Sequence, residues 1–217
     1  MKKNFFLIGL LMIITLTQLI MSNNIFIYTV IFIYAIIFYL TTRYSGKMLY
    51  RFSQKKEIFN TNLYVFIGIK EKAFTYGKDI FVSSSLLEDE TNARVIVEHE
   101  KIHATKHVQL IKMSVYLMVT SNILDIYGII VGNYIIILLG ILMMVLTIIM
   151  RKSLEIEADI LASKKVGKSS YIIMLEWLAN HSSKLNNPSN IWMKIVVVLL
   201  STHPTINTRI KKVLTSR

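Results

Sequence analysis

Five consecutive residues, His99-Glu100-Lys101-Ile102-His103, place two imidazoles four positions apart with a carboxylate beside the first. In a helix, side chains four residues apart lie on one face, so both imidazoles can reach one metal ion. Glu100 is then placed to take a proton from an attacking water molecule. The pattern predicts a zinc-dependent hydrolytic site. The plain alternative is a solvated helix that happens to be rich in histidine.

A catalytic zinc site uses three protein ligands and keeps one position open. The chain has no cysteine, which excludes a thiolate ligand, a thiol nucleophile and a disulfide framework. Among the acidic residues, Glu155 and Asp159 are four apart and share a helical face. This stretch is the candidate source of the missing ligand, although a charged, solvated helix face would show the same spacing.

Three apolar blocks, at 4–21, 25–40 and 113–150, account for much of the 53% hydrophobic content. The first two are each expected to form one membrane-spanning helix, and the third is long enough for two. All 25 Lys and Arg residues lie outside these blocks and outside the short connections within each pair of spans. The positive-inside rule therefore explains the net charge of +12 by membrane orientation, rather than by nucleic-acid binding.

The predicted fold is a mostly α, multi-pass membrane protein with four transmembrane helices and both termini in the cytosol. Residues 1–42 would form the first transmembrane hairpin, 43–112 a cytosolic region, 113–150 the second hairpin and 151–217 a second cytosolic region. A small β-hairpin or sheet is expected from the β-branched and aromatic residues at 63–69 and 79–83, followed by a helix from 88 to 112. Asp125 is expected in or near the outer turn of the second hairpin, with a functional intramembrane acid as the alternative.

This topology brings the candidate ligands to the same side of the membrane, because a hairpin returns the chain to the side it left. His103 precedes the third span by about 15 Å of helix, and Glu155 follows the fourth span by little more than one turn. The metal would therefore lie close to the bilayer surface. That position favours substrates that are membrane-bound or amphipathic.

Several stretches together resemble one known family. They occur in the order Ala73–Gly77 with Ile80-Phe81-Val82, His99–His103, Glu155–Asp159, and Ser201-Thr202-His203-Pro204 with Arg209-Ile210. With these motifs over residues 60–215, the chain is similar to the integral membrane zinc metallopeptidases of the HExxH gluzincin type, typified by HtpX and the CAAX prenyl protease. The resemblance implies a cytosolic zincin-like protease domain that binds one zinc ion.

The resemblance also implies roles for individual residues. His99, His103 and Glu155 would be the zinc ligands, and Glu100 the general base.

Around them, Asp159 would hold a ligand imidazole or a neighbouring helix in place. His203 would stabilise the developing oxyanion, and Arg209 would brace the loop that carries His203. The strand Ile80-Phe81-Val82 would be an edge onto which an extended peptide adds.

Two positions depart from the family pattern. Ile102 stands where the family often has a small residue, and the stretch from His107 to Gln109 stands where it often has an acidic one. His107 shares the face of His99 and His103, but about 12 Å of helical rise separates it from His99, too far to share one zinc. His107 is expected to be a surface or interface histidine.

The leading functional hypothesis is a zinc endopeptidase in a bacterial plasma membrane, acting on membrane-associated proteins or peptides at the cytosolic face. The bacterial origin is suggested by the abundance of Ile, Lys and Asn, which is typical of AT-rich genomes. One alternative is a BlaR-like signalling protease that cleaves a repressor. Another is a non-enzymatic membrane protein for binding or immunity with a structural zinc, although such sites normally have four protein ligands. The sequence predicts neither an oligomeric state nor a particular substrate.

Overall fold

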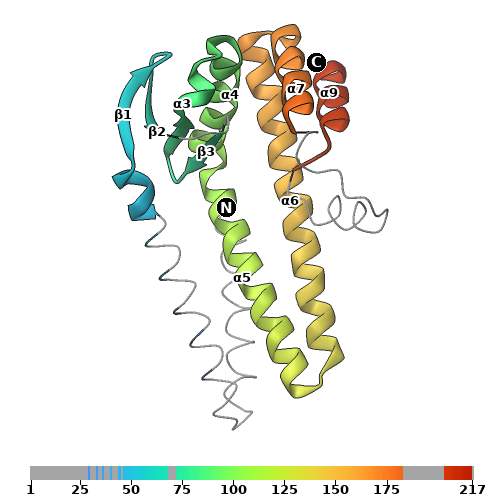
Figure 1. The fold of residues 1–217 in the computed structure, drawn as a ribbon. Helices are drawn as coiled ribbons and strands as arrows, with labels where there is room; N and C mark the ends of the chain where they lie inside the picture. Colours follow the sequence, from blue (N-terminus) through green and yellow to red (C-terminus); the bar gives the residue numbers. More distant parts are fainter. Residues whose placement is uncertain are drawn as a thin grey trace. The chain divides into compact units, whose positions relative to one another are not determined.

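The computed structural model describes residues 46–67, 72–182 and 203–216, together with single positions at 29, 33, 36, 40 and 44. The described chain is mostly helical with one small sheet (Figure 1). It divides into two compact units: Met1–Ser45 with Val115–Thr147, and Gly46–Ser114 with Ile148–Arg217. Apart from those single positions, the predicted hairpin at 1–42 lies outside the described residues.

The sheet is mixed and has the strand order β1-β2-β4-β3. Its strands are β1 (Ser53–Ile58), β2 (Thr61–Phe66), β3 (Ala73–Tyr76) and β4 (Asp79–Ser83). Two antiparallel hairpins, β1–β2 and β3–β4, are joined by parallel pairing of β2 with β4. The two segments predicted to be strands are thus β2 and β4, but they are not partners in one hairpin.

Both hairpins close through two-residue turns. Phe59 and Asn60 have φ values of 54° and 53°, which a type I′ turn requires at both central positions. In the second turn Gly77 has a φ of 65°, a conformation that glycine adopts without steric cost. The strands that the sequence did not predict are the outer ones: β1 is largely polar and exposed, and β3 has only four residues.

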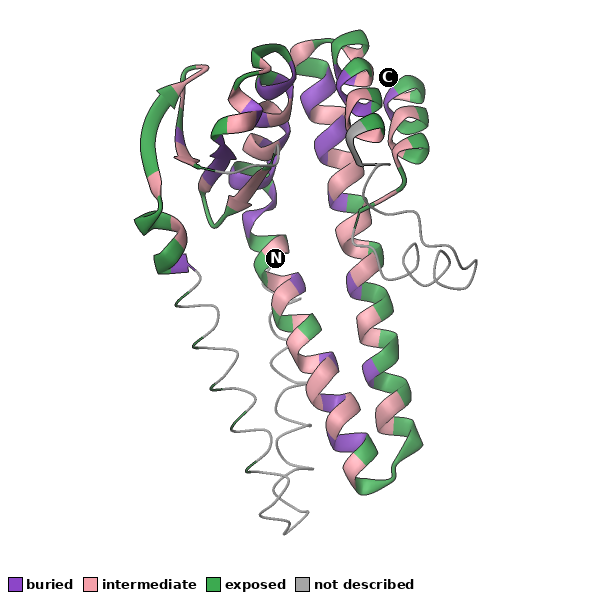
Figure 2. Ribbon diagram, viewed as in Figure 1, coloured by how far each residue is buried: buried purple, intermediate pink, exposed green. Residues whose placement is uncertain are grey.

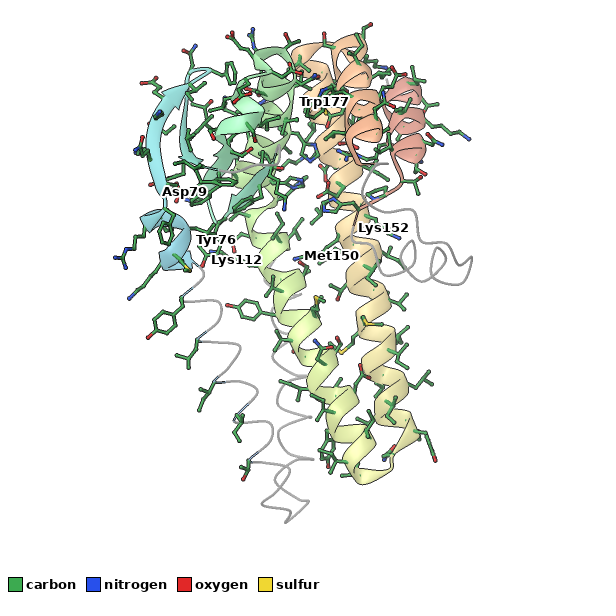
Figure 3. The ribbon with its side chains drawn as sticks, viewed as in Figure 1. Tyr76, Asp79, Lys112, Met150, Lys152 and Trp177 are labelled. Carbon is green, nitrogen blue, oxygen red and sulfur yellow. The ribbon has the colours of Figure 1, made fainter. Side chains whose placement is uncertain are left out.

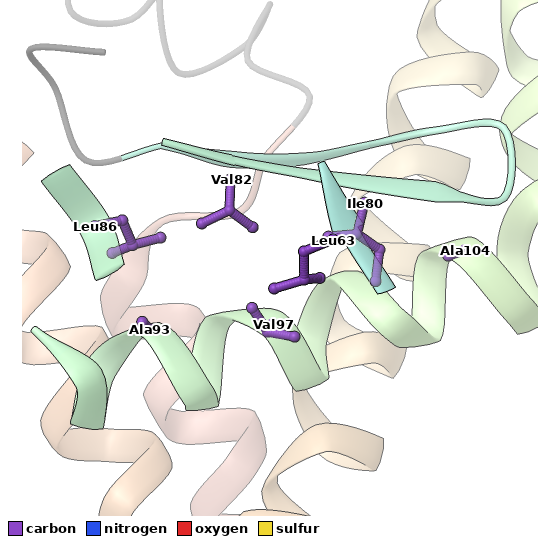
Figure 4. Close-up of a cluster of buried hydrophobic side chains, with 7 residues drawn as sticks. All are labelled: Leu63, Ile80, Val82, Leu86, Ala93, Val97 and Ala104. Atoms are coloured by element: carbon purple, nitrogen blue, oxygen red, sulfur yellow. The ribbon is translucent and has the colours of Figure 1, made fainter. Parts of the chain in front are cut away.

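One face of the sheet packs on helix α4 (Glu90–Ile102) and forms the first hydrophobic core. Alternate residues of β4, Ile80 and Val82, point to this side, as does Leu63 of β2, and they meet Ala93 and Val97 of the helix (Figure 4). This period of two is the pattern of a strand with distinct faces. The core therefore fixes the position of α4 on this face of the sheet.

The opposite face of the sheet carries an aromatic cluster. Phe81 stacks on Tyr64 and Phe74, with ring centroids 5.0 and 5.5 Å apart, and Tyr50 meets it edge-on at 5.2 Å. Tyr50 comes from the helical segment at 46–51. The residues Ile80-Phe81-Val82 are thus buried, and their strand β4 pairs with β2 on one side and β3 on the other. The prediction that this strand is an edge is wrong, and the edge strand on that side is β3.

The remaining helices follow the sheet in sequence, with α3 before α4 and the others after it. They are α3 (Ser84–Leu87), the π-helical turn η1 (His103–His107), α5 (Val108–Val131), α6 (Tyr134–Val166), α7 (Lys168–Ser182) and α9 (Ile206–Thr215). A second hydrophobic core joins α4, α6, α7 and α9 through Val95, Ala162, Tyr171, Leu175 and Val213. This core brings the start of α4 and the end of α6 together in one unit.

Two helices are long and apolar enough to cross a membrane, one running through Glu90–Val131 and the other being α6. They are joined at Gly132 and Asn133. Along 134–150 of α6, all of which the structure describes, only Gly140 and Thr147 are buried, as Figure 2 shows for this helix. An apolar surface of this kind is typical of a helix that faces lipid.

Asp125 lies within α5 rather than at the turn. A Cβ added to Gly140 would come within 2.1 Å of Asp125 Oδ1, so the carboxylate fits against α6 only because position 140 has no side chain. Small residues that allow close helix contact are characteristic of membrane hairpins. Asp125 was expected in or near the outer turn, and the structure places it seven residues before Gly132, inside the helix rather than in the turn itself.

Candidate metal centre

The two histidines of the motif lie on the buried side of α4 and at the start of η1. Asp89 begins α4 as its N-cap, accepting a hydrogen bond from the Asn92 amide, and the apolar positions that follow turn one face toward the sheet. His99 and His103 are 6% and 5% exposed. Their Nε2 atoms lie 3.1 Å apart, so the spacing of four residues does place both imidazoles at one point.

Glu155 reaches the same point from α6. Its Oε1 atom lies 3.3 Å from His103 Nε2, and its Oε2 atom lies 3.5 Å from His99 Nε2. One ligand atom from each of His99, His103 and Glu155 falls within 4.8 Å of the others. Residues 52 or more positions apart in the sequence are thus brought together by the packing of α6 beside α4.

The separations suit a single small cation. Donor atoms around a tetrahedral zinc ion, with ligand bonds of about 2.0–2.2 Å, lie roughly 3.3–3.6 Å from one another. The distances of 3.1, 3.3 and 3.5 Å are close to that range. Two imidazoles and one carboxylate are also the ligand set of one well-known class of catalytic zinc site. The residues present therefore fit a zinc ion with one coordination position left open.

The electrostatics of the cluster favour positive charge. Burial alone would lower the pKa of His99, but hydrogen bonds with Asp159 and Glu155 outweigh it and raise that pKa to about 9. Burial would likewise raise the pKa of Glu155, yet the surrounding imidazoles of His103, His203 and His99 hold it well below its usual value. A site that stabilises a proton on a buried imidazole also stabilises a bound cation.

A buried network supports His99 from behind. Its Nδ1 atom lies 2.8 Å from the Tyr171 hydroxyl and 3.1 Å from Asp159 Oδ1, and Tyr171 donates to the same carboxylate at 2.6 Å. Arg209 forms a bidentate pair with Asp159, with its Nε and Nη2 atoms at 2.7 and 2.6 Å. Burial would raise the pKa of Asp159, but Arg209 and His99 lower it, so the carboxylate is ionised.

This network refines the predicted role of Arg209. The residue was expected to brace the loop that carries His203, and its direct partner is Asp159. Because Arg209 lies in α9, which starts three residues after His203, the same ion pair also anchors that loop. Tyr171 was not predicted, since a single tyrosine in an apolar helix looks like a core residue.

Glu100 lies on the open side of the cluster and is held by the edge strand. The Thr75 hydroxyl of β3 donates to Glu100 Oε2 at 2.7 Å and lies 3.0 Å from the Glu100 carbonyl oxygen. Thr75 falls in the family-like stretch Ala73–Gly77, but nothing in the sequence indicated this contact. The candidate base is therefore positioned by the strand that borders the site.

His203 also reaches the cluster. Its Nδ1 atom lies 3.0 Å from Glu155 Oε2, while 65% of its side chain is exposed. The hydrogen bond with Glu155 raises the pKa of His203, despite the opposing effect of burial. The structure thus places an exposed, readily protonated imidazole at the mouth of the site.

Two hollows of about 290 and 220 Å³ flank the cluster, and both are bordered by Ala73, Glu100, Glu155 and His203. The larger also contacts Phe74, Ile111, Arg151 and Leu154. The smaller has an apolar side formed by Leu86, Ile96, Met174 and Leu178. Both hollows are thus bordered by β3 and by the candidate metal cluster.

His107 is not on the surface. Its side chain is fully buried at 0% exposure, so the prediction of a surface or interface histidine is wrong. Its Nδ1 atom lies 3.2 Å from His103 Nδ1, and its Nε2 atom lies 3.3 Å from Glu157 Oε2. His107 was considered only as a possible ligand beside His99, from which the helical rise separates it. Its close neighbour is the ring of His103.

Comparison with known protein families matches residues 40–217 to peptidase family M48. The comparison with curated proteins and the comparison with solved structures returned no match. The family match covers the sheet, the metal cluster, both long helices and the segment with His203 and Arg209. It confirms the family resemblance drawn from the sequence motifs.

Proposed function

Because the chain belongs to peptidase family M48, which implies metallopeptidase activity, we propose that it is a zinc endopeptidase of the bacterial plasma membrane. Its substrates would be membrane-associated or amphipathic proteins and peptides, cut at the cytosolic face. The observation that carries this proposal is the convergence of His99, His103 and Glu155 beside an independent carboxylate, Glu100.

In this account His99, His103 and Glu155 hold one zinc ion. When bound, the zinc supplies Lewis-acid activation of the peptide carbonyl and of the attacking water. Glu100, held by Thr75, accepts the proton of that water and passes it to the leaving amine. His203, which is exposed at the mouth of the site, donates a hydrogen bond to the oxygen on which negative charge develops.

Substrate binding by strand addition is supported by the ladder between β3 and β4. The outer residues of a two-residue hairpin turn form a hydrogen-bonded pair, and such pairs alternate with non-bonded ones along an antiparallel ladder. Tyr76 pairs with Asp79 and Phe74 with Phe81, while Ser83 donates to the Lys72 carbonyl at 2.8 Å. The main-chain groups of Ala73 and Thr75 therefore point away from β4, toward the hollows, and can pair with an extended peptide.

The membrane location rests on charge and hydropathy. Lys112 on α5 and Lys152 on α6 lie at a similar level in Figure 3, and the apolar stretch between them in sequence carries only one charged residue besides Arg151, Asp125. Glu155 follows Met150, the last residue of the apolar block 113–150, by about 7.5 Å of helix. A zinc ion at Glu155 would thus lie near the boundary of the bilayer, within reach of a membrane-bound substrate.

Proteolysis by purified variants tests the proposal. We expect Glu100→Gln to keep zinc and lose cleavage of a membrane-protein substrate, whereas Glu155→Ala loses both. Glu98→Gln is the matched control, because Glu98 pairs with Lys101 and Lys165 and borders neither hollow. Full cleavage by Glu100→Gln, in the presence of zinc, would overturn the assignment of the base.

A further inference from the structure

His107 occupies an unusual place for a polar side chain. It is fully buried at the end of η1, a single π-helical turn that interrupts an otherwise continuous helix. Such turns are rare and occur disproportionately at functional sites. A buried imidazole without hydrogen-bond partners destabilises the fold, so an apolar residue would be expected here unless the ring has a partner.

The partner is the neighbouring metal-ligand candidate. His103 directs its Nε2 atom to the cluster, 3.1 Å from His99 Nε2 and 3.3 Å from Glu155 Oε1. Its other nitrogen therefore points away from the metal position and lies 3.2 Å from His107 Nδ1. The two rings are 5.2 Å apart between centroids and are tilted by 59°, so they are not simply stacked.

The protons of this pair follow from the ligand role of His103. A neutral imidazole that binds a metal through Nε2 carries its proton on Nδ1. That proton needs an acceptor, and His107 Nδ1 is the atom in reach. His107 must then carry its own proton on Nε2, which lies 3.3 Å from Glu157 Oε2, a charge contact whose angle is outside that of a hydrogen bond. Glu157, 43% exposed, is in turn paired with Lys106.

We propose that His107 is a positioning residue that accepts a hydrogen bond from the metal ligand His103 and is itself oriented by Glu157. The inference rests on the proposed function, since it requires His103 to bind zinc. It gives the two ligand imidazoles different supports: His99 has the Asp159 carboxylate, and His103 has a neutral ring backed by a carboxylate. Partners of this kind fix the orientation of the ligand ring and raise its basicity.

Substitution of His107 separates this role from simple packing. His107→Leu keeps a side chain of comparable bulk and removes the acceptor, whereas His107→Asn places an amide oxygen near the position of Nδ1. We expect the Leu variant to bind zinc about ten- to a hundredfold more weakly in competition with a chelator. The Asn variant should recover most of that loss. The visible spectrum of the Co²⁺-substituted protein should change in the Leu variant and resemble wild type in the Asn variant.

A second pair of variants changes the exposed residues next to His107 and leaves the buried imidazole itself unaltered. Glu157→Ala removes the carboxylate that orients His107, and we expect severalfold weaker zinc binding. Lys106→Ala removes the same surface ion pair but leaves the carboxylate facing His107, so zinc affinity should be unchanged. This comparison decides the matter if His107→Leu does not fold.

The outcomes are distinct. Wild-type zinc affinity in a folded His107→Leu variant would overturn the inference, as would an Asn variant no better than Leu. Equal zinc affinities for Glu157→Ala and Lys106→Ala would also overturn it. If the wild-type protein itself binds no zinc, the proposed function fails, whereas normal zinc binding by every variant removes only the role of His107.

Discussion

At the scale of single residues, the candidate centre is built from side chains that each have a defined partner. His99 is supported by Asp159 and Tyr171, His103 by His107, and Glu100 by Thr75. Freedom to rotate would weaken both metal binding and proton transfer, because catalytic groups must be held close to their productive geometry. The supporting residues should therefore influence the metal and the reaction without touching either.

Asp159 offers a direct test of this support. Asp159→Asn removes the charge that pairs with the buried Arg209 guanidinium and faces His99. We expect about ten- to hundredfold weaker zinc binding. Breaking a buried ion pair on one side should also cost about 3–5 kcal/mol of stability. Chelator competition and thermal unfolding in detergent measure the two effects.

The control for this substitution makes the same chemical change at a helix end. Asp89→Asn keeps a side-chain oxygen at the N-cap of α4, where Asn is as good as Asp, and should alter neither quantity. Equal zinc affinity of Asp159→Asn and wild type would contradict the assigned role of Asp159.

Thr75 should affect the rate rather than substrate affinity. Thr75→Val keeps the β-branched shape but removes the hydroxyl that donates to Glu100. Loss of one hydrogen bond to a charged group is worth about 1.5–3 kcal/mol, so kcat should fall by roughly 10- to 100-fold with KM nearly unchanged. Thr61→Val in β2 serves as the control, because the Thr61 hydroxyl donates to the Phe59 carbonyl at 3.2 Å. A kcat equal to that of the control would refute the role of Thr75.

At the scale of elements, the sequence predicted local features well and long-range pairing poorly. The spacing of His99 and His103 fixed a shared helical face, and the alternation in β4 fixed a strand, because both depend on neighbouring residues. The parallel pairing of β2 with β4 joins segments that are not adjacent in the sequence. It places β4, the expected edge strand, inside the sheet. No local pattern marked the π-helical turn that buries His107.

The edge strand β3 provides the element-scale prediction. Ala73→Pro removes a main-chain N–H that points away from β4 and leaves the ladder to β4 intact, which proline tolerates at an edge. If peptides add to β3, losing one hydrogen bond should lower kcat/KM by about tenfold or less, mainly through KM. Ala73→Val introduces a side chain similar in size to that of proline but keeps the main-chain N–H, so it should retain near wild-type kcat/KM. Equal kinetics of the two variants would contradict strand addition at Ala73.

At the scale of the whole molecule, two long helices carry both the apolar hairpin and the metal ligands. Helix α6 continues from the apolar, largely exposed segment 134–150 to Glu155. The helix formed by α4, η1 and α5 carries His99 and His103 and continues into the apolar segment that begins at Met113. Both helices are thus continuous between the apolar segments and the candidate metal ligands. The first predicted hairpin, at 1–42, stays a prediction.

The absence of cysteine makes the topology directly measurable. Tyr134 is 83% exposed at the hairpin turn, and Ser169 is exposed on α7. We expect Tyr134→Cys to react with a membrane-impermeant maleimide added to intact cells, once any outer envelope barrier is opened. Ser169→Cys should react only after the plasma membrane is permeabilised. The reverse pattern would contradict a cytosolic active site.

In the proposed function, His99, His103 and Glu155 bind one zinc ion between two helices. Zinc content per chain, measured on detergent-purified protein after dialysis, tests it most directly. The account predicts one zinc for wild type and for the control Glu176→Ala, at an exposed position of α7, and none for Glu155→Ala. One zinc per chain retained by a folded Glu155→Ala variant would contradict it.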